Sequence, residues 1–327
     1  MIALDENMAK DFLKKNNIQN YQIKKVAGDA SFRSYYRIFF SEKTLILMFA
    51  PPQYEDIRPF EKIADFLFQN NFSAPKIFAR DEENGFLLLE DLGDDTYSRV
   101  LAKLPNNQLI EAELSLYKNA CDCLIELHKM MPPQNLPVYN HALLFREVML
   151  FIDWYLPLQK KNISLAEKAQ FKFLWFQLFD LLSKEEQVLV LRDYHADNLM
   201  VLPNRKDHQK VGLLDFQDGV IGAKAYDLVS LLEDARRDLD HQNRIYLLDY
   251  YLKNSSALKP VFTRDYEILS LQRNIKILGI FARLSMRDNK HYYLNLLPRV
   301  LNFVIMRLNS PNPIFTEIGN FLKKFIN

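Results

Sequence analysis

The sequence predicts an α+β fold in which a small antiparallel β-sheet lobe, residues 1–91, precedes a larger and mostly helical lobe, residues 92–327. Apolar and polar residues alternate in residues 32–40, and a short apolar run fills residues 44–49, as in β-strands. Beyond the polar stretch DLGDD at 91–95, apolar residues recur mainly at helical spacing. The chain has 327 residues, 49% of them apolar, which is enough for a sizeable core.

One helix and one hairpin complete the predicted N-terminal lobe. Apolar side chains recur at helical spacing in residues 58–70, and Pro59 suits the first turn of a helix. Residues 76–80 and 85–90 are strand-like and are joined by the polar residues 81–84, which favours a β-hairpin. We therefore expect a sheet with one helix in this lobe.

The predicted C-terminal lobe consists of helices that a strand-rich island interrupts. The predicted helical segments are 112–130, 164–183, 225–252 and 266–287. The island contains the short apolar runs 188–191, 199–202 and 211–214. We expect these runs to form one small sheet.

Three polar side chains are expected to meet at one edge of that small sheet. Asp193 follows the first predicted strand, Asn198 opens the second, and Asp215 follows the third. Mg²⁺ binds oxygen ligands and keeps several waters, so a carboxylate and an amide suffice from the protein. We expect Asn198 and Asp215 to bind the metal, and Asp193 to take the proton of an acceptor hydroxyl. The spacing between Asp193 and Asn198 alone is also that of a turn with an Asx cap, which is the alternative.

Composition disfavours several other classes of protein. Lys and Arg number 42 against 41 Asp and Glu, so no long-range field attracts nucleic acid or an anionic membrane. The eight glycines form neither a phosphate-binding loop motif nor a dinucleotide motif. Cys121 and Cys123 lack the spacing of a zinc or redox motif, which favours reduced thiols. No apolar run has the length of a membrane helix, so we expect a cytoplasmic protein without a membrane partner.

The strand-rich island resembles the catalytic and metal-binding motifs of the aminoglycoside-phosphotransferase and protein-kinase-like superfamily. The segments that carry this resemblance are LRDYHADNLMVL and VGLLDFQD. Further segments resemble one branch, the bacterial anomeric kinases for N-acetylmuramate and N-acetylglucosamine: AGDASFRSYYRI, LMFAPPQYEDIRPF, GFLLLEDLGDDTY, LLDFQDGVIGAKAYDLVSLLEDAR and QRNIKILGIFARLSMRD. The resemblance implies a protein-kinase-like two-lobed fold, ATP and Mg²⁺ as cofactors, and a hydroxyl group of a small molecule as the phosphate acceptor.

The resemblance also implies roles for individual residues. Asp193 falls at the catalytic aspartate, and Asn198 and Asp215 fall at the metal positions. The residues implied to bind ATP are Gly28, Asp29, Ala30 and Ser31, in a loop over the phosphates, and Glu90, Asp91 and Leu92, at a hinge that holds adenine. Asp227 falls at a buried acid that braces the catalytic loop, with a helix N-cap or a surface acid as the alternative.

Two positions depart from the pattern of the superfamily. Leu191 stands where a histidine is usual, so the catalytic loop must be braced in another way. The third strand usually offers a lysine to the phosphates, but Met48 or Phe49 stands there, and Met48 is most simply a core residue. The phosphate-binding cation is then expected to be Arg33 or Lys43, unless the metal ion supplies most of the charge.

The acceptor is expected to be a small molecule, because only a short segment separates Asp215 from the next helix. The late helix carries Arg273, Lys276, Arg283 and Arg287, which disfavours a polycationic acceptor and suits the carboxylate of N-acetylmuramate. The predicted acceptor contacts are His195, Gln217, Asp218, Arg283 and Arg287. The alternatives are a solvated helix face for the basic residues and a structural role in the loop for His195.

The expected function is therefore transfer of phosphate from ATP to the anomeric hydroxyl of an N-acetylated amino sugar, in cell-wall recycling. Two alternatives stay open: a kinase of another small acceptor, such as an aminoglycoside or a choline-like molecule, and a nucleotide-binding pseudokinase module. The missing strand lysine favours the pseudokinase, whereas the presence of Asp193, Asn198 and Asp215 together argues against it. No particular oligomeric state is predicted.

Overall fold

The chain forms two compact units. The computed structural model describes all residues except 1–3, 27–31, 185–186 and 327. The sheet unit comprises residues 1–103 and 197–219, and the helical unit comprises residues 104–196 and 220–327. The functional lobe boundary expected after residue 91 stays a prediction.

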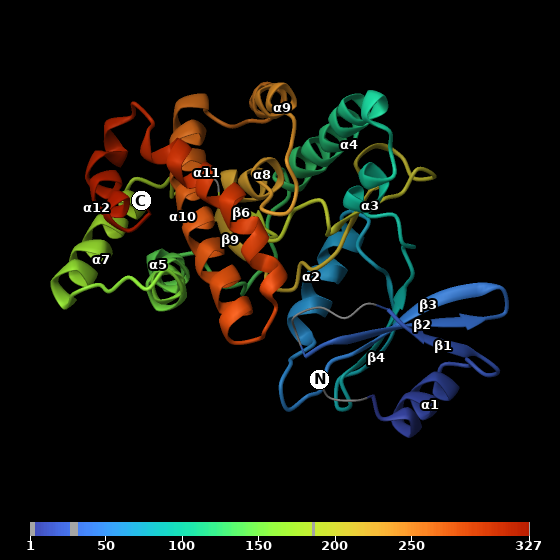
Figure 1. Ribbon diagram of the computed structural model, residues 1–327. Helices are drawn as coiled ribbons and strands as arrows, with labels where there is room; N and C mark the ends of the chain where they lie inside the picture. The colour runs from blue at the N-terminus through green and yellow to red at the C-terminus, as the bar shows by residue number, and fades with distance from the viewer. Residues whose placement is uncertain (1–3, 27–31, 185–186, 327) are drawn as a thin grey trace. The chain divides into compact units, whose positions relative to one another are not determined.

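A five-stranded antiparallel sheet forms the centre of the sheet unit (Figure 1). The strands follow the spatial order β1-β2-β3-β5-β4. Their bounds are β1 (Gln22–Lys25), β2 (Ser34–Phe40), β3 (Lys43–Phe49), β4 (Ile77–Asp81) and β5 (Phe86–Glu90). The two predicted N-terminal strands and the predicted β4–β5 hairpin are confirmed, whereas β1 was not predicted.

Helix α1 (Glu6–Lys15) packs on one face of this sheet, so the expectation of one helix here is wrong. The Asp5 carboxylate caps the helix by accepting hydrogen bonds from the backbone N–H groups of Asn7 and Met8. The buried residues that join helix and sheet into one core are Ala9, Phe12, Leu13, Ile18, Ile38, Leu47, Phe49, Phe86 and Leu88. The helix was missed because charged residues surround its three buried side chains.

Side chains alternate along β3, which places Leu47 and Phe49 in that core and Met48 on the opposite face. Met48 is fully buried, which confirms its interpretation as a core residue. Helix α2 (Arg58–Gln69) has Pro59 in its first turn, as predicted. The unit also contains the helix α3 (Tyr97–Ala102), the strands β7 (Leu199–Val201) and β8 (Val211–Leu213), and the 3₁₀ turn η2 (Asp207–Lys210).

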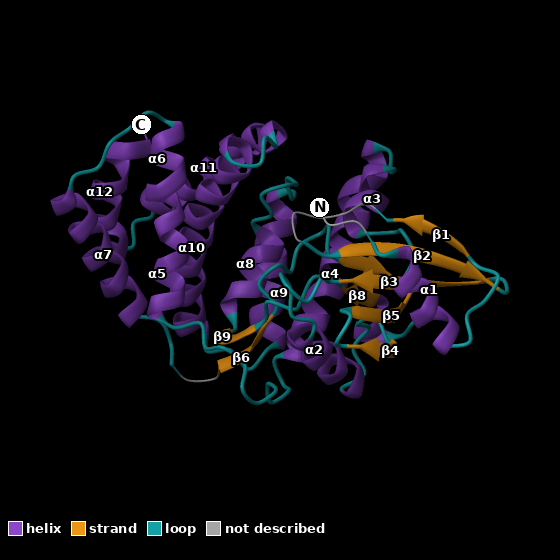
Figure 2. Ribbon diagram, turned by 90° about the horizontal axis from the view of Figure 1, so that it is seen from below, coloured by secondary structure: helices purple, strands orange, loops and turns teal. Residues whose placement is uncertain are grey.

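Helices dominate the helical unit (Figure 2). Their bounds are α4 (Asn106–Leu127), α5 (His141–Leu150), α6 (Leu156–Leu158), α7 (Leu165–Asp180), α8 (Ala225–Leu232), α9 (His241–Asn254), α10 (Lys259–Met286), α11 (Leu297–Leu308) and α12 (Thr316–Ile326). The π-helical segment η1 (Phe151–Tyr155) and the 3₁₀ turns η3 (His291–Leu296) and η4 (Pro313–Phe315) complete the unit. The long helix α10 is central, because α5, η1, α8 and α11 all pack against it.

The single helix expected over residues 225–252 is wrong, since α8 and α9 are separate helices. The chain leaves the helix at Glu233, whose buried carboxylate binds Ser270 and Arg307 on other elements. Asp240 then caps α9 by accepting hydrogen bonds from two backbone N–H groups.

The strand-rich island forms two separate two-stranded sheets, so the expectation of one small sheet is wrong. Strand β6 (Gln187–Val190) pairs with β9 (Val220–Ala223) within the helical unit. Strand β7 pairs with β8 within the sheet unit. Strand β9 escaped prediction because it is short and contains Gly222, a residue that is unfavourable in strands. Asp193 consequently belongs to the helical unit, whereas Asn198 and Asp215 belong to the sheet unit.

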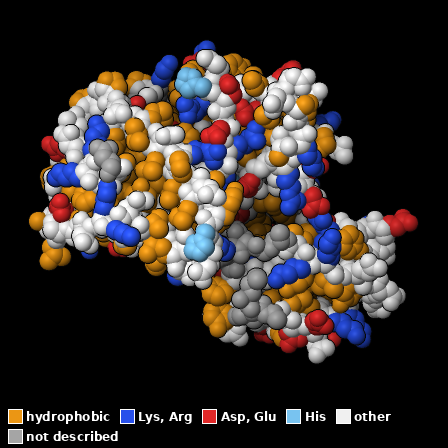
Figure 3. All heavy atoms as spheres, in the orientation of Figure 1, with side chains coloured by type: hydrophobic (Ala, Val, Ile, Leu, Met, Phe, Trp, Pro, Cys, Tyr) orange, Lys and Arg blue, Asp and Glu red, His pale blue; other side chains and the backbone are white. Residues whose placement is uncertain are grey.

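The remaining expectations on composition concern the surface and the cysteines. On the face drawn in Figure 3, basic and acidic side chains are interspersed and do not separate into fields of one sign. Cys121 and Cys123 are buried on α4 and are free thiols. Of the helices that the described residues form, none combines the length and the apolar character needed to cross a membrane.

Candidate functional site

Asn198 and Asp215 lie side by side in the sheet unit. Asn198 immediately precedes β7, and Asp215 follows β8 by two residues. Because β7 and β8 are antiparallel, the start of one strand meets the end of the other. The Asn198 amide nitrogen Nδ2 lies 3.4 Å from the Asp215 carboxylate oxygen Oδ2. The fold thus brings together the two side chains that the sequence singled out as metal ligands.

Asp215 has an unusual backbone conformation that its neighbours hold in place. Its φ is +56°, in the left-handed region that non-glycine residues rarely adopt. The Gln217 side-chain amide donates a 2.8 Å hydrogen bond to Oδ1 of Asp215. Between these two residues, Phe216 is buried and stacks on Phe60 of α2 with ring centroids 4.9 Å apart. Residues with a strained backbone, such as Asp215, cluster at functional sites, where surrounding contacts stabilise them.

The Asn198 and Asp215 side chains fit a hard divalent cation such as Mg²⁺. Turning the Asn198 amide about its terminal bond presents its oxygen, in place of its nitrogen, beside the Asp215 carboxylate. Across the residues that the structure describes, no three His, Cys, Asp or Glu side chains gather as a fuller set of ligands. Waters and phosphate oxygens, the usual further ligands of Mg²⁺, would complete the coordination.

Asp193 lies in the helical unit, in a loop after β6 that Asp227 of α8 braces. The fully buried Asp227 carboxylate accepts hydrogen bonds from the backbone N–H groups of Leu191, at 2.6 Å, and Arg192, at 2.8 Å. Burial raises the pKa of Asp227 to about 7, although these two N–H donors favour its ionised form. These contacts support the interpretation of Asp227 as a brace for this loop and not as a surface acid. They also hold the backbone at Leu191, where the usual histidine is missing.

The Arg192 side chain, next to the candidate base, ends in a buried charge cluster on Glu147 of α5. The Arg192 guanidinium and the Lys276 ammonium both donate to Oε1 of Glu147, the latter at 2.9 Å. The Gln272 amide, at 3.0 Å, and the Tyr139 hydroxyl donate to the other oxygen, Oε2. Burial alone would raise the pKa of Glu147, but Lys276 and Arg192 lower it to about 2. The ionised Glu147 therefore ties α5 and α10 to the residue before Asp193.

His195 is buried two residues after the candidate base. Its ring nitrogen Nε2 lies 3.2 Å from Nη1 of Arg236. A guanidinium can only donate hydrogen bonds, so Nε2 accepts and the proton lies on Nδ1. Burial, together with Arg236 and Arg273, holds the pKa of His195 well below its usual value. His195 is therefore an uncharged imidazole that accepts a hydrogen bond from Arg236 and is influenced by the charge of Arg273.

Several of the predicted phosphate-binding residues cannot be placed or have other partners. Gly28, Asp29, Ala30 and Ser31 lie outside the described residues. Arg33 forms an ion pair with Glu55, with 3.2 Å between Nη2 and Oε2. Lys43 is exposed at the turn of the β2–β3 hairpin, whereas Arg33 precedes β2 at the opposite end. A phosphate at Arg33 would therefore compete with the Glu55 carboxylate.

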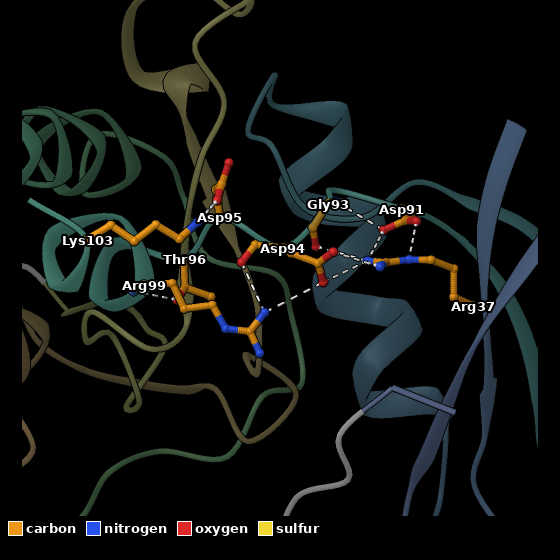
Figure 4. Close-up of polar contacts among 8 residues, drawn as sticks. All are labelled: Arg37, Asp91, Gly93, Asp94, Asp95, Thr96, Arg99 and Lys103. Carbon is orange, nitrogen blue, oxygen red and sulfur yellow. Dashed lines mark hydrogen bonds and ion pairs between the residues drawn. The ribbon is translucent and has the colours of Figure 1, made fainter. Parts of the chain in front are cut away.

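The segment after β5, predicted to hold adenine, is anchored to β2 by Arg37 (Figure 4). The Arg37 guanidinium lies 2.6 Å from Oδ2 of Asp91 and 2.8 Å from Oδ2 of Asp94. It also donates a 3.2 Å hydrogen bond to the carbonyl of Gly93. Gly93 has a φ of +88°, a conformation that glycine adopts without strain. These contacts fix the course of the backbone from residue 91 to residue 94.

The other residues predicted to contact the nucleotide or the acceptor differ in their partners and in their exposure. The Glu90 carboxylate accepts a hydrogen bond from Arg205 at 2.5 Å. Arg287 is exposed and forms an ion pair with Asp288, at 2.7 Å. Burial and the neighbouring Arg287 lower the pKa of Arg283, which is partly buried. Gln217 binds Asp215, as described above, and Asp218 is exposed in the sheet unit.

Sequence reasoning missed two residues that these contacts bring forward, Glu147 and Arg37. Glu147 lies within the mostly apolar segment HALLFREVML, and an acid in such a helix was a usable signal for a buried ion pair. Arg37 alternates with the apolar residues of β2, and its pattern alone is that of an ordinary solvent-facing strand residue.

Comparisons with known proteins identify the family and similar proteins. The model of the family described as "Phosphotransferase enzyme family" matches residues 22–262. The N-acetylmuramate/N-acetylglucosamine kinase of Pseudomonas aeruginosa is 36% identical over 307 residues, which cover 90% of this chain and 86% of that protein. The protein of the same name from Caulobacter vibrioides is 31% identical, over 96% of this chain and 95% of its own length.

A solved structure confirms the predicted protein-kinase-like fold. The crystal structure of ADP-bound aminoglycoside phosphotransferase APH(2'')-Ib matches with a TM-score of 0.59 and 14% sequence identity. The match covers 93% of this chain and 99% of that one. A likeness at this level of identity concerns the fold alone.

Proposed function

The chain belongs to the phosphotransferase enzyme family, and on that premise we propose that it transfers the γ-phosphate of ATP to the anomeric hydroxyl of an N-acetylated amino sugar. The observation that carries the proposal is the Asn198–Asp215 pair, whose side chains lie 3.4 Å apart. A carboxylate beside an amide, on a backbone held in a strained conformation, suits a cation that accompanies a nucleotide.

Each residue of the proposed site has a distinct task. Asn198 and Asp215 would hold Mg²⁺ against the phosphates of ATP, and the bound ion would supply positive charge where the transition state gathers negative charge. Asp193 would orient the acceptor hydroxyl and take its proton. Asp227 and Glu147 would keep the loop that carries Asp193 in place, through the backbone and the side chain of Arg192.

The nucleotide would be held by backbone groups near Asp91, which Arg37 immobilises. The position of the usual strand lysine is occupied by the buried Met48, so no cation reaches the phosphates from that strand position. The ion at Asn198 and Asp215 would then supply most of the positive charge. This predicts that turnover depends more steeply on Mg²⁺ than in kinases that have the strand lysine.

The names of the two relatives favour an N-acetylated amino sugar as the acceptor. The charges around the candidate base agree with a neutral or anionic acceptor. The positive charge of Arg273 acts on the neutral His195, and a buried guanidinium near the candidate base repels the ammonium groups of an aminoglycoside or of choline.

A product assay tests the proposal. The protein is incubated with magnesium-ATP and, separately, N-acetylmuramate, N-acetylglucosamine, choline and an aminoglycoside, and the phosphorylated position is located by ³¹P and ¹³C NMR. We expect phosphate on the anomeric oxygen of the amino sugars. Phosphate on another hydroxyl, or turnover of choline or the aminoglycoside alone, would contradict the proposed acceptor.

Asp193→Asn serves as the paired variant, because it removes the proton acceptor and leaves the shape of the side chain. We expect turnover to fall by about 10³-fold or more, in line with the loss of a general base and its positioning, while calorimetry shows unchanged nucleotide affinity. A wild-type protein that binds ATP and phosphorylates no acceptor would instead support a pseudokinase module.

A further inference from the structure

The basic residues of α10, together with Arg287 at its C-cap, divide into those with an acidic partner and those without one. Lys276 donates to Glu147, and Arg287 forms an ion pair with Asp288. Arg273 and Arg283 form no ion pair with any other residue in the described ranges, from 4 to 26, 32 to 184 and 187 to 326. Arg283 lies ten residues further along the helix, roughly 15 Å at 1.5 Å per residue. Arg273 is therefore the cation of this helix that has no ion pair among the described residues and lies far from Arg283.

Arg273 is a buried cation with an unsatisfied donor among the described residues. Its side chain belongs to a residue that is only 3% exposed, and its Nη1 has no acceptor among the described residues. Its neighbours on the helix differ, since Gln272 donates to Glu147 and Asn274 donates to Glu233. An unsatisfied donor on a buried guanidinium is costly, and proteins retain such groups mainly where a ligand or another partner satisfies them.

The surroundings of Arg273 locate it beside the loop that carries the candidate base. The positive charge of Arg273 acts on both His195 and Asp227. His195 follows Asp193 by two residues, and Asp227 accepts hydrogen bonds from the two residues before Asp193. Arg236 donates to the imidazole of His195. All of these groups belong to the helical unit.

We propose that the Arg273 guanidinium, beside Arg236 and His195, binds the carboxylate of an acidic N-acetylated amino sugar and thereby selects N-acetylmuramate over N-acetylglucosamine. This inference rests on the proposed function, because it concerns the acceptor of that same reaction. A guanidinium matches a carboxylate with two parallel N–H donors, and the bond is charge-assisted. The carboxylate would accept from the buried Nη1 donor of Arg273, and its charge would balance that guanidinium. The neutral His195 would contribute a hydrogen bond without adding charge.

The test compares the two sugars in one set of variants. Arg273→Met removes the donors and the charge, and Arg273→Lys keeps the charge but loses the planar fork. We measure kcat/KM for N-acetylmuramate and for N-acetylglucosamine and take their ratio. In Arg273→Met, we expect that ratio to fall about 10- to 100-fold, as for the loss of a hydrogen bond to a charged group. Arg273→Lys should recover part of the ratio.

The control is Arg264→Met, which removes a partly exposed arginine from the same helix, where it pairs with Asp265. This control should leave the ratio within about twofold, as expected for a surface ion pair. An equal fall for both sugars in Arg273→Met would assign Arg273 a structural role and overturn the inference. An unchanged ratio would overturn it as well.

A binding measurement separates this inference from the proposed function. Calorimetry with N-acetylmuramate, in the absence of nucleotide, should show that Arg273→Met weakens binding at least tenfold. If the wild-type protein phosphorylates neither sugar, the proposed function fails, and the calorimetric comparison still decides whether Arg273 binds the carboxylate. If Arg273→Met does not fold, Arg273→Lys provides both readouts, and an unchanged affinity for N-acetylmuramate overturns the inference.

Discussion

Glu147→Gln removes the buried carboxylate that balances Arg192 and Lys276 and leaves the shape of the side chain unchanged. We expect two consequences. The helical unit loses stability, because two cations remain buried beside a neutral amide. The loop before Asp193 loses the contact that holds the Arg192 side chain, so the turnover number kcat falls while nucleotide affinity is retained.

The size of the stability loss follows from the ionisation of Glu147. Its pKa falls from the usual 4.5 to about 2. At about 1.36 kcal/mol per pKa unit, the ionised form stabilises the fold by roughly 3 kcal/mol. Breaking a buried ion pair by removing one partner typically costs about 3–5 kcal/mol, which agrees. We therefore expect the free energy of unfolding to fall by about 3 kcal/mol at pH 7. For kcat we expect a fall of about 10- to 100-fold, as for a small misplacement of a catalytic group.

The pH dependence has a defined sign. Because the pKa of Glu147 is lowered in the folded state, its contribution is complete above the unfolded pKa of 4.5 and disappears as the pH falls towards about 2. The difference in stability between the wild type and Glu147→Gln should therefore shrink over this interval.

Urea unfolding followed by tryptophan fluorescence measures the effect, because both tryptophans, Trp154 and Trp175, lie in the helical unit. The control is Glu126→Gln, which removes a half-exposed partner of Lys129 and should cost less than about 0.5 kcal/mol. Adding Lys276→Met to Glu147→Gln should restore part of the stability, because it removes one unbalanced charge. A loss below about 1 kcal/mol in Glu147→Gln, the level of a surface pair, would refute the reasoning.

Three further predictions follow from single contacts. Arg37→Met frees the segment at Asp91 and should raise the KM for ATP about tenfold, the effect of losing one charge-assisted bond, without changing the KM for the sugar. Equal changes in both KM values would argue against an adenine-binding segment. Asp227→Asn replaces a carboxylate that accepts from two backbone N–H groups by an amide that accepts fewer hydrogen bonds. We expect kcat to fall at least about tenfold, while the nucleotide affinity measured by calorimetry stays constant. An unchanged kcat would contradict the role of Asp227 as a brace of the loop. Gly279→Ala places a Cβ 2.2 Å from the carbonyl carbon of Leu150. We expect it to lower the free energy of unfolding in urea by about 2–3 kcal/mol, as overpacking does. In the control Gly319→Ala, the Cβ meets nothing closer than 3.6 Å, so the free energy of unfolding should not fall.

The parts of the fold that the sequence predicted are those with a clear local period. Strands β2 and β3 alternate apolar and polar residues or form compact apolar runs, and α2 has a strong stripe behind Pro59. Helix α1 was missed because its few apolar residues stand among charged ones and give little periodic signal. Strand β9 was missed because it has only four residues, one of them a glycine. The pairing of β6 with β9, and of β7 with β8, depends on long-range contacts that no local pattern contains.

Of the candidate site, too, the sequence could predict only the part that depends on local order along the chain. The meeting of Asn198 and Asp215 was predictable, because a strand–turn–strand segment of this length returns the chain to its starting edge. The buried charge cluster was not predictable, since Glu147 lies 45 residues from Arg192 and 129 residues from Lys276 along the chain.

Metal binding at Asn198 and Asp215 tests the central claim most directly. The affinity for Mn²⁺, as a spectroscopic substitute for Mg²⁺, is measured by electron paramagnetic resonance in the presence of a non-hydrolysable ATP analogue. Asp215→Asn and Asn198→Ala should each weaken Mn²⁺ binding at least about tenfold, as expected for the loss of a ligand held by its neighbours, while Asp193→Asn should keep the wild-type affinity. Unchanged Mn²⁺ affinity in Asp215→Asn or Asn198→Ala would contradict the account.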